Sequence, residues 1–186
     1  MKEKVRCGWC KGDPLYERYH DEEWGRPVYD DETLFEFLLL ETFQAGLSWI
    51  TILRKRDNFA EAFDNFDYRK IANYDDGKIE ELLQNPGIIR NRLKILAAVS
   101  NARAFMEVQQ EHGSFSDYFW GFSGGKPIVN SFTQLKEVPA TTPLSDAISK
   151  DLKKRGFKFV GSTVIYAHMQ ATGMVNDHIT SCWTRL

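Results

Sequence analysis

The sequence has no long apolar run, no excess of one charge and few cysteines, and each of these features excludes a class of protein. No stretch reaches the roughly 18 apolar residues that a membrane span requires, and the opening residues, MKEKVRCGW, contain no apolar segment of a secretory signal. We therefore expect a cytoplasmic protein with no membrane partner. With 24 basic and 26 acidic residues the formal net charge is −2. Any indication of a nucleic-acid partner must therefore come from a local patch.

The three cysteines, Cys7, Cys10 and Cys182, cannot all pair with one another. Disulfides are also rare in the cytosol, so we expect these side chains to be free thiols or metal ligands. Three cysteines cannot supply the four thiolates of an iron–sulfur cluster, which argues against an iron–sulfur endonuclease.

Helical patterns dominate the sequence. Asp30 or Asp31 can cap a helix through LFEFLLLETF, and Gly46 can separate it from a helical LSWITILRKRDNFAEAF. Apolar residues keep a helical period over 95–106, in a long helix that Gly113 can end. Because strand patterns are scarce, we predict an all-α fold for 1–186. The hydrophobic content of 42% suits one domain, whose two helical lobes pack closely around a shared core.

The C-terminal part of the chain has the pattern of two helices joined by a tight turn. SDAISKDLKKR can begin with a cap at Ser145, GFKFVG supplies the turn, and STVIYAHMQATG forms an apolar helix that Gly173 can close. The preceding GGKPIVNSFTQLKEVPATTP is rich in Gly, Pro and Thr, and we expect it to be a connecting loop.

A carboxylate interrupts the most apolar of the predicted helices. Glu41 shares the helix face of Leu34, Phe37 and Leu38, whereas Glu36 points elsewhere and can be solvated. Burying a carboxylate without a partner is costly. We therefore expect Glu41 to have a compensating neighbour or to await a ligand.

Five residues could bind a metal ion. His178 and Cys182 are four positions apart, so on a helix they would face the same way, as half of a tetrahedral zinc shell. Cys7, Cys10 and His20 are three candidates for the remaining two positions. Such a site would join the N- and C-terminal segments, and four protein ligands would make it structural rather than catalytic. The alternative is that Cys182 is a small apolar side chain and His178 a polar surface residue.

Basic residues gather at the predicted hairpin. Gly156 and Gly161 lie among the cationic residues Lys150, Lys153, Lys154, Arg155 and Lys158. Backbone N–H groups of a glycine turn that opens a helix can bind a phosphate, so we interpret this segment as a clamp on the DNA backbone. A solvated helix face would give the same run of charges.

Aromatic residues accompany Glu41 in the N-terminal part of the sequence. They are Trp9, Tyr16, Tyr19, Trp24 and Trp49. Aromatic faces with one carboxylate favour a flat, positively charged ring. The same residues could equally form a core around a satisfied glutamate.

Six blocks follow one another over almost the entire chain: RCGW at 6–9, DPLYERYHDEEWG at 13–25, ETFQAGLSWITIL at 41–53, NPGIIRNRLKI at 85–95, KKRGFKFVGST at 153–163 and VNDHITSC at 175–182. In this order they resemble the DNA-3-methyladenine glycosylase I family. The resemblance implies a helix-hairpin-helix DNA repair enzyme, acting as a monomer on alkylated double-stranded DNA. Such an enzyme flips out 3-methyladenine, hydrolyses its N-glycosidic bond, releases the free base and leaves an abasic site. It uses no redox cofactor and no lyase lysine.

The resemblance also assigns roles to individual residues. It implies one structural zinc ion, with Cys10 left as a free thiol and the ligands Cys7, His20, His178 and Cys182. It implies that Glu41 is the catalytic, base-reading residue, and that the base lies among Trp9, Tyr19, Glu41 and Trp49. The implied DNA contacts are Leu47, which would fill the gap in the base stack, together with Lys153, Arg155, Gly156, Lys158 and Gly161.

Three alternatives accompany this interpretation. Many helix-hairpin-helix glycosylases place a catalytic aspartate at about the position of Asp177, but the family that this chain resembles is not expected to use it. We therefore interpret Asp177 as a partner of the zinc site or a cap. A non-enzymatic, zinc-stapled DNA-binding module would bind duplex DNA and release no base. A zinc hydrolase would need an open coordination position.

Overall fold

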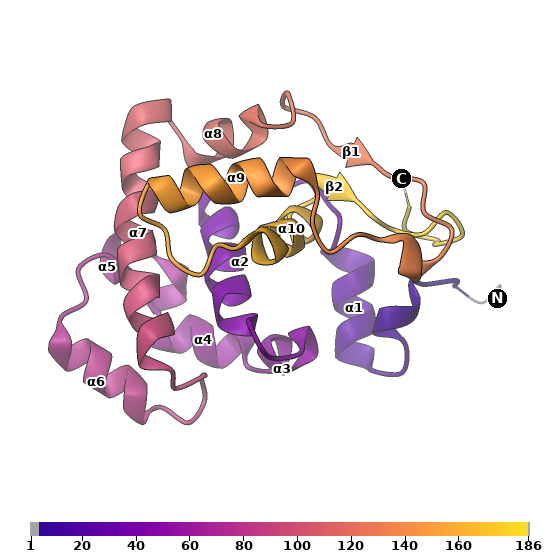
Figure 1. The fold of residues 1–186 in the computed structure, drawn as a ribbon. Coiled ribbons are helices and arrows are strands. Elements are labelled where there is room, and N and C mark those ends of the chain that lie inside the picture. The colour runs from indigo at the N-terminus through magenta and orange to yellow at the C-terminus, as the bar shows by residue number, and fades with distance from the viewer. Residues whose placement is uncertain (1–3, 186) are drawn as a thin grey trace.

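The structure, a computed structural model, describes residues 4–185 and is mostly helical (Figure 1). In chain order its elements are η1 (Gly8–Cys10), α1 (Pro14–Glu22), α2 (Asp31–Gln44), α3 (Trp49–Arg54), α4 (Arg56–Ala62), η2 (Asp64–Phe66), α5 (Tyr68–Ile71), α6 (Asp76–Gln84), α7 (Arg92–His112), α8 (Phe115–Gly121), β1 (Ile128–Val129), η3 (Leu135–Glu137), α9 (Pro143–Lys154), α10 (Ser162–Ala171) and β2 (Val175–Asn176). The prediction of a helical fold is confirmed. Within residues 4–185 the strands form a single parallel pair, β1 with β2. No helix in that range combines the length and apolar character that crossing a bilayer would need.

Capping residues explain where several helices begin and end. Asp30 accepts a hydrogen bond from the Thr33 N–H at 2.8 Å and starts α2, and Gly113, with φ of 87°, ends α7. These two ends were predicted. The start of α9 was not, because the cap is Thr142 rather than Ser145. Pro143 follows that cap and occupies the first helical position, where a missing N–H costs nothing.

The segment after Gly46 was predicted as continuous helix, and this was wrong in one place. Lys55, with φ −97° and ψ 0°, separates α3 from α4. The change of direction lets Ile52 on α3 and Phe59 on α4 both reach the core, where each is fully buried. Packing therefore overrides local helix propensity at this position.

Helix α2 runs through the middle of the molecule. It packs against α3, α7, α8 and α10, and apolar side chains cover most of its circumference. A helix that is apolar on nearly all sides belongs in the interior. The interior position of α2 brings Glu41 into the core region, with a side chain only 3% exposed.

The C-terminal pair of helices, α9 and α10, is joined by the turn at 155–161, and neighbouring elements hold this turn in place. The Asn101 side chain on α7 accepts a hydrogen bond from the Lys158 N–H at 2.8 Å and donates one to the Lys158 carbonyl at 3.0 Å. The Ser149 hydroxyl on α9 donates to the Val160 carbonyl at 2.6 Å. The backbone of the turn is therefore fixed while several of its side chains remain exposed.

The N- and C-terminal segments lie on the same side of the molecule (Figure 1). The Trp183 N–H donates to the Val5 carbonyl at 2.9 Å, and the Val28 N–H donates to the Thr172 carbonyl at the same distance. These backbone contacts bring together residues from both ends of the sequence, as the predicted metal site requires.

Replacing Gly173 with alanine is expected to destabilise the protein by roughly 2–5 kcal/mol. Gly173 has φ of 73°, and an added Cβ would overlap the backbone of Arg26 and Pro27. Gly124→Ala is the matched control, because Gly124 has φ of 69° and no atom within 4 Å of a Cβ there. Denaturant unfolding of both variants measures the difference. If Gly173→Ala and Gly124→Ala lost the same unfolding free energy, the close approach of Gly173 to the backbone of Arg26 and Pro27 would contribute nothing to the loss.

Candidate active site and metal centre

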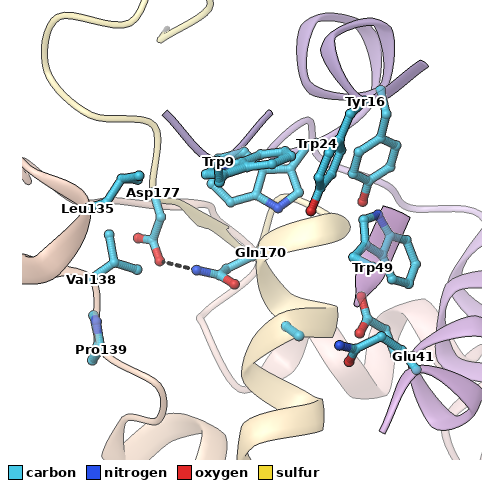
Figure 2. Close-up of a pocket in the computed structure, with 13 residues that line it drawn as sticks. Trp9, Tyr16, Trp24, Glu41, Trp49, Leu135, Val138, Pro139, Gln170 and Asp177 are labelled. Carbon is cyan, nitrogen blue, oxygen red and sulfur yellow. Dashed lines mark hydrogen bonds between the residues drawn. The ribbon is translucent and has the colours of Figure 1, made fainter. Parts of the chain in front are cut away.

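A cavity of about 430 Å³ lies between the N-terminal elements η1, α1, α2 and α3 and the C-terminal elements η3 and α10 (Figure 2). Aromatic rings form one wall, and aliphatic and amide side chains form the opposite wall. Its lining consists of Trp9, Tyr16, Tyr19, Trp24, Glu41, Gln44, Trp49, Leu135, Val138, Pro139, Ala167, Gln170 and Asp177. The cavity therefore contains all four residues predicted to surround the base, each supplied by a different element: η1, α1, α2 and α3.

The aromatic wall is built on α1. Asp13 caps this helix by accepting hydrogen bonds from the backbone N–H groups of Leu15 and Tyr16. The cap fixes the start of the helix, so that Tyr16 and Tyr19, three positions apart, share the face toward the cavity. The Trp9 ring lies 4.8 Å from the Tyr16 ring between centroids.

The other rings continue this wall without filling the space in front of it. The centroid of Trp9 lies 5.0 Å from that of Trp24, and the centroid of Tyr19 lies 5.7 Å from that of Trp49. These aromatic residues therefore do not form only a closed core, because they also line the cavity. Exposed aromatic faces of this kind can stack on a planar ligand.

Glu41 is one of the ionisable residues that line the cavity (Figure 2). Burial raises the pKa of its carboxyl group to about 8, and no hydrogen bond within residues 4–185 opposes that shift. The carboxyl group is therefore neutral below that pH in the free protein. In the same part of the chain, the buried indole N–H of Trp49 also has no acceptor. The cavity thus contains an unpartnered carboxyl group that a ligand could satisfy, and one of its lining residues, Trp49, carries a buried N–H without an acceptor among the described residues.

Glu36, on the same helix, has a different environment. It was expected to be solvated, but its carboxylate accepts a hydrogen bond from the Arg56 guanidinium at 2.7 Å, and its side chain is 19% exposed. Arg56 also pairs with Glu23 at the end of α1, so it links α1 to α2. Of the three glutamates on α2, Glu32 and Glu36 have arginine partners, and among the described residues Glu41 has none.

Asp177 lies on the cavity wall opposite Glu41 (Figure 2). It accepts hydrogen bonds from the Tyr166 hydroxyl at 2.5 Å, the Asn130 amide at 2.7 Å and the Gln170 amide at 2.9 Å. It was interpreted as a partner of the metal site or a cap. Its hydrogen bonds instead hold Gln170, another residue of the cavity wall.

Several cavity residues were not predicted from the sequence. Gln44 could have been found, because it lies one helical turn after Glu41. Gln170 and Ala167 lie on a helix that was predicted, but nothing in the sequence indicates which face meets the cavity. Leu135, Val138 and Pro139 belong to the segment predicted to be only a connecting loop, and no periodicity marks them.

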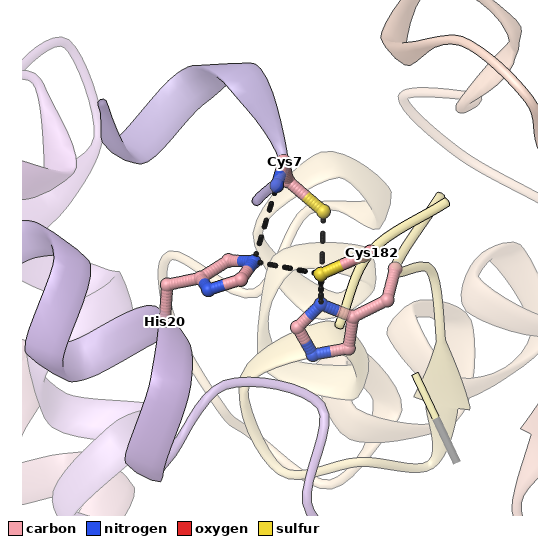
Figure 3. A group of neighbouring side chains, drawn as sticks. Cys7, His20 and Cys182 are labelled. Carbon is pink, nitrogen blue, oxygen red and sulfur yellow. Dashed lines mark hydrogen bonds between the residues drawn. The ribbon is translucent and has the colours of Figure 1, made fainter. Parts of the chain in front are cut away.

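Four potential metal ligands converge behind the aromatic wall. One ligand atom from each of Cys7, His20, His178 and Cys182 lies within 4.8 Å of all the others, and all four residues are buried. Figure 3 shows Cys7, His20 and Cys182 pointing toward a common centre. The Cys182 sulfur lies 3.4 Å from His178 Nδ1 and 3.5 Å from His20 Nε2, and the Cys7 sulfur lies 3.6 Å from His178 Nδ1.

These distances fit a tetrahedral metal shell. Bond lengths of about 2.0 Å to nitrogen and 2.3 Å to sulfur place neighbouring nitrogen and sulfur ligands about 3.5 Å apart. The other nitrogen of each ring already has a partner, since His20 Nδ1 lies 2.8 Å from Asp21 Oδ1 and His178 Nε2 lies 3.0 Å from the Trp24 carbonyl. Burial lowers the pKa of His178 to about 4, which keeps this ring neutral and able to bind a cation. The cluster could hold a metal ion.

One detail of the metal prediction was wrong. His178 and Cys182 are not on a helix, because β2 ends at Asn176 and the chain then turns, with the Cys182 N–H donating to the Ile179 carbonyl at 2.9 Å. The turn nevertheless brings both ligand atoms to the cluster. Cys10 lies outside the cluster, and its sulfur donates to the Cys7 carbonyl at 3.1 Å.

None of the predicted DNA contacts is among the residues that line the cavity. Lys153, Gly156 and Lys158 are exposed around the turn between α9 and α10, and Gly161 is the N-cap of α10. Arg155 is engaged by Asp151 at 2.7 Å and Glu111 at 2.6 Å. Leu47, 38% exposed, follows α2 in a separate turn.

Comparison with known proteins places this geometry in a family. The sequence profile described as methyladenine glycosylase matches residues 9–185. The chain belongs to the methyladenine glycosylase family. The resemblance noted in the sequence is therefore confirmed.

Members of the methyladenine glycosylase family are similar to the chain over almost its full length. DNA-3-methyladenine glycosylase 1 of Escherichia coli (strain K12) is 51% identical over 177 residues, covering 95% of each chain. The DNA-3-methyladenine glycosylase of Haemophilus influenzae is 48% identical over 178 residues, covering 96% of each chain.

Solved structures of the family have the same fold. A crystal structure of 3-methyladenine DNA glycosylase I superposes with a TM-score of 0.94 at 52% identity, covering 96% of this chain and 98% of the other. The enzyme from Staphylococcus aureus, solved to explain 3-methyladenine recognition, gives 0.95 at 35% identity, covering 97% and 96%. A tyrosine-to-phenylalanine variant of such a glycosylase was solved in complex with 3-methyladenine.

Proposed function

We propose that this protein is a DNA glycosylase that removes 3-methyladenine from alkylated double-stranded DNA. It hydrolyses the N-glycosidic bond, releases the base and leaves an abasic site. The observation that supports this most directly is Glu41, a buried carboxyl group that has no hydrogen bond among the described residues and lies in a cavity walled by aromatic rings. Relatives named for the same activity cover almost the whole chain.

The cavity suits a cationic purine. Methylation at N3 gives adenine in DNA a positive charge, which makes the base a good leaving group, so that little proton donation is needed. Stacking on Tyr19 and Trp49 favours a positively charged ring. Glu41 would ionise as that ring enters and accept a hydrogen bond from its amino edge, and Trp9 would close the aromatic wall. Neutral adenine gains neither the ion pair nor the full stacking energy, so it is rejected.

The α9–α10 unit would serve as the helix-hairpin-helix clamp on the DNA backbone. No side chain within the described residues caps the N-terminus of α10, so backbone N–H groups after Gly161 can meet a phosphate. Lys153, Gly156 and Lys158 are exposed beside this end. Arg155 would contribute less charge, because two carboxylates already neutralise it. Leu47 would fill the space that the flipped nucleotide leaves.

Alanine at Lys153 or Lys158 is expected to weaken duplex binding by a similar amount on every DNA sequence. A lysine that contacts a phosphate releases about one counterion, so each change should reduce the slope of log K against log salt by about 1. Lys126→Ala, an exposed lysine outside the hairpin, is the matched control. Salt titrations by fluorescence anisotropy measure the slopes. Identical slopes for all three variants would refute the clamp.

The cluster of cysteines and histidines would bind one structural zinc ion. Cys7 and Cys182 would supply thiolates, and His20 and His178 would supply neutral imidazoles, which fills a tetrahedral shell and leaves no position for a reacting water. The ion would hold the N-terminal segment that carries Trp9 against α1 and the C-terminal segment. With its terminal segments joined by the ion, the chain would form a single domain of two closely packed helical lobes.

Release of free base from methylated duplex DNA, identified by chromatography, tests the proposed activity. Selective release of 3-methyladenine over adenine and guanine is expected. A folded, metal-loaded protein that binds the duplex and releases no base would instead be the DNA-binding module considered from the sequence. The two functions therefore give opposite results in one assay.

A further inference from the structure

Lys94, near the start of α7, is a buried lysine without a carboxylate partner in the described part of the chain. Its side chain is 6% exposed. Its ammonium group donates to the Phe43 carbonyl at 2.9 Å and to the Ala45 carbonyl at 2.7 Å. Burial lowers the pKa of Lys94. A buried ammonium group is costly, so its position at these two carbonyls requires an explanation.

The two carbonyls belong to the C-terminal end of α2. The last carbonyls of a helix have no partner within the helix and carry its negative dipole, so a cation there is favourable. Lys94 therefore joins the end of α2 to the start of α7. The side chain of Asn91 caps α7 by accepting from the Lys94 N–H at 3.1 Å, which fixes the lysine backbone in turn.

The turn that follows α2 is held at the same place. Gly46 has φ of 82°, and the Leu47 N–H donates to the Gln44 carbonyl at 2.7 Å. The Gln44 amide donates back to the Leu47 carbonyl at 2.6 Å. Gln44 and Lys94 thus fix this turn from two sides, and Leu47 is exposed at its tip.

We propose that Lys94 is a positioning residue for base extrusion. By fixing the carbonyls of Phe43 and Ala45, it sets the direction in which Leu47 enters the DNA stack, without touching the extruded base. This inference rests on the proposed glycosylase function. An apolar side chain at this position would pack more cheaply but would leave both carbonyls without partners, and the turn would lose its link to α7.

Release of 3-methyladenine from methylated duplex DNA and from the same DNA after strand separation tests this role. In Lys94→Met, release from the duplex is expected to fall by a factor on the order of 10 to 100, as expected when a positioning group moves by about 1 Å. Release from separated strands should be nearly unchanged, because an unpaired base is easier to extrude. Binding of free 3-methyladenine, followed by tryptophan fluorescence, should also be unchanged.

A double-mutant cycle with Leu47→Ala shows whether the lysine acts through the leucine. The double variant should be no worse on duplex DNA than Leu47→Ala alone, since the two residues serve one step. Gly46→Ala is a second way to disturb the turn, because a Cβ at Gly46 has nothing within 4 Å and only the backbone is strained. It should show the same selective loss on duplex DNA, even if Lys94→Met folds poorly.

Lys55→Met is the matched control. Lys55 also donates its ammonium hydrogens to backbone carbonyls, those of Pro86 and Gly87, but these lie outside the turn that carries Leu47. The ratio of base release from duplex DNA to release from separated strands should be the same for Lys55→Met as for wild type. The inference would be overturned if Lys94→Met lost base release equally on duplex DNA and on separated strands. It would also be overturned if the effects of Lys94→Met and Leu47→Ala on duplex DNA were additive. If wild-type protein releases no base from either form, the proposed function fails and this role fails with it.

Discussion

Replacing Glu41 with glutamine is expected to make the folded protein more stable at high pH while reducing excision of 3-methyladenine. The pKa of the buried carboxyl group is raised from 4.5 to about 8, so folded Glu41 holds its proton over a range in which the unfolded chain has lost it. Its contribution to stability is complete below about pH 4.5 and is lost progressively as pH rises to about 8. Glutamine does not titrate, so the unfolding free energy of Glu41→Gln relative to wild type rises across that range, by up to a few kcal/mol.

The loss of excision has the same physical origin. A carboxylate that is costly to ionise in the empty cavity becomes favourable when a cationic base provides the opposite charge. Removing that charge-assisted hydrogen bond costs about 1.5–3 kcal/mol, which corresponds to roughly a 10- to 100-fold loss in kcat/KM. Wild-type binding of the cationic base should also release a proton below about pH 8.

Denaturant unfolding of wild type and Glu41→Gln at about pH 5 and about pH 9, together with base release, measures both effects. Glu36→Gln is the matched control, because it removes a carboxylate from the same helix that is paired with Arg56. That change should cost stability. If the difference in unfolding free energy between wild type and Glu41→Gln did not change with pH, the raised pKa of Glu41 would be contradicted.

Removing the proposed zinc ion, by chelation or by Cys182→Ser, is expected to lower the free energy of unfolding by several kcal/mol and the melting temperature by roughly 10 °C. The four candidate ligands come from the N- and C-terminal segments, so a bound ion would strengthen a junction that hydrogen bonds such as Trp183 N–H to the Val5 carbonyl already make. Base binding should weaken as well. The Trp24 ring lies 4.7 Å from that of His178, and Trp9 follows Cys7 by two positions, so the aromatic wall depends on the cluster.

Cys10→Ser provides the control for the metal prediction. Cys10 is as buried as Cys7, but its sulfur only donates to the Cys7 carbonyl, which a serine hydroxyl can also do. Elemental analysis should find one equivalent of zinc in wild type and Cys10→Ser and much less in Cys182→Ser. The prediction fails if Cys182→Ser retains its metal and melts with wild type.

The parts of the fold and site that were predictable are those with a local signal. Asp30 and Gly113 mark helix ends because capping depends on residues next to the end. Glu41 was noticeable because a charge within an apolar run breaks a short-range pattern. Residue type indicated five candidate metal ligands, and the family resemblance implied the four that the structure brings together, although the local structure assumed for His178 and Cys182 was wrong.

The remaining features depend on contacts between distant segments. Val138 and Pro139 line the cavity only because the loop before α9 folds back toward α1, and the sequence around them has no period. Lys94 looks like an ordinary helix lysine until the end of α2 is placed beside it. The pairing of Glu36 with Arg56 likewise depends on α4 turning away from α3. Packing of whole elements decides these contacts, so no short window of sequence contains them.

The position of the cysteine and histidine cluster has a consequence for biosynthesis. Cys7 and Cys182 are 175 positions apart in the sequence (182 − 7), so the four-residue cluster stays incomplete during translation until Cys182 has been added. The cavity is likewise incomplete until Asp177 has been added. A nascent chain therefore lacks part of the cavity lining until residue 177 has been added, and a product that ends before Asp177 has neither the complete cavity nor the four-residue cluster. The proposed metal ion can therefore meet its full set of four ligands only in a chain that has been translated through Cys182.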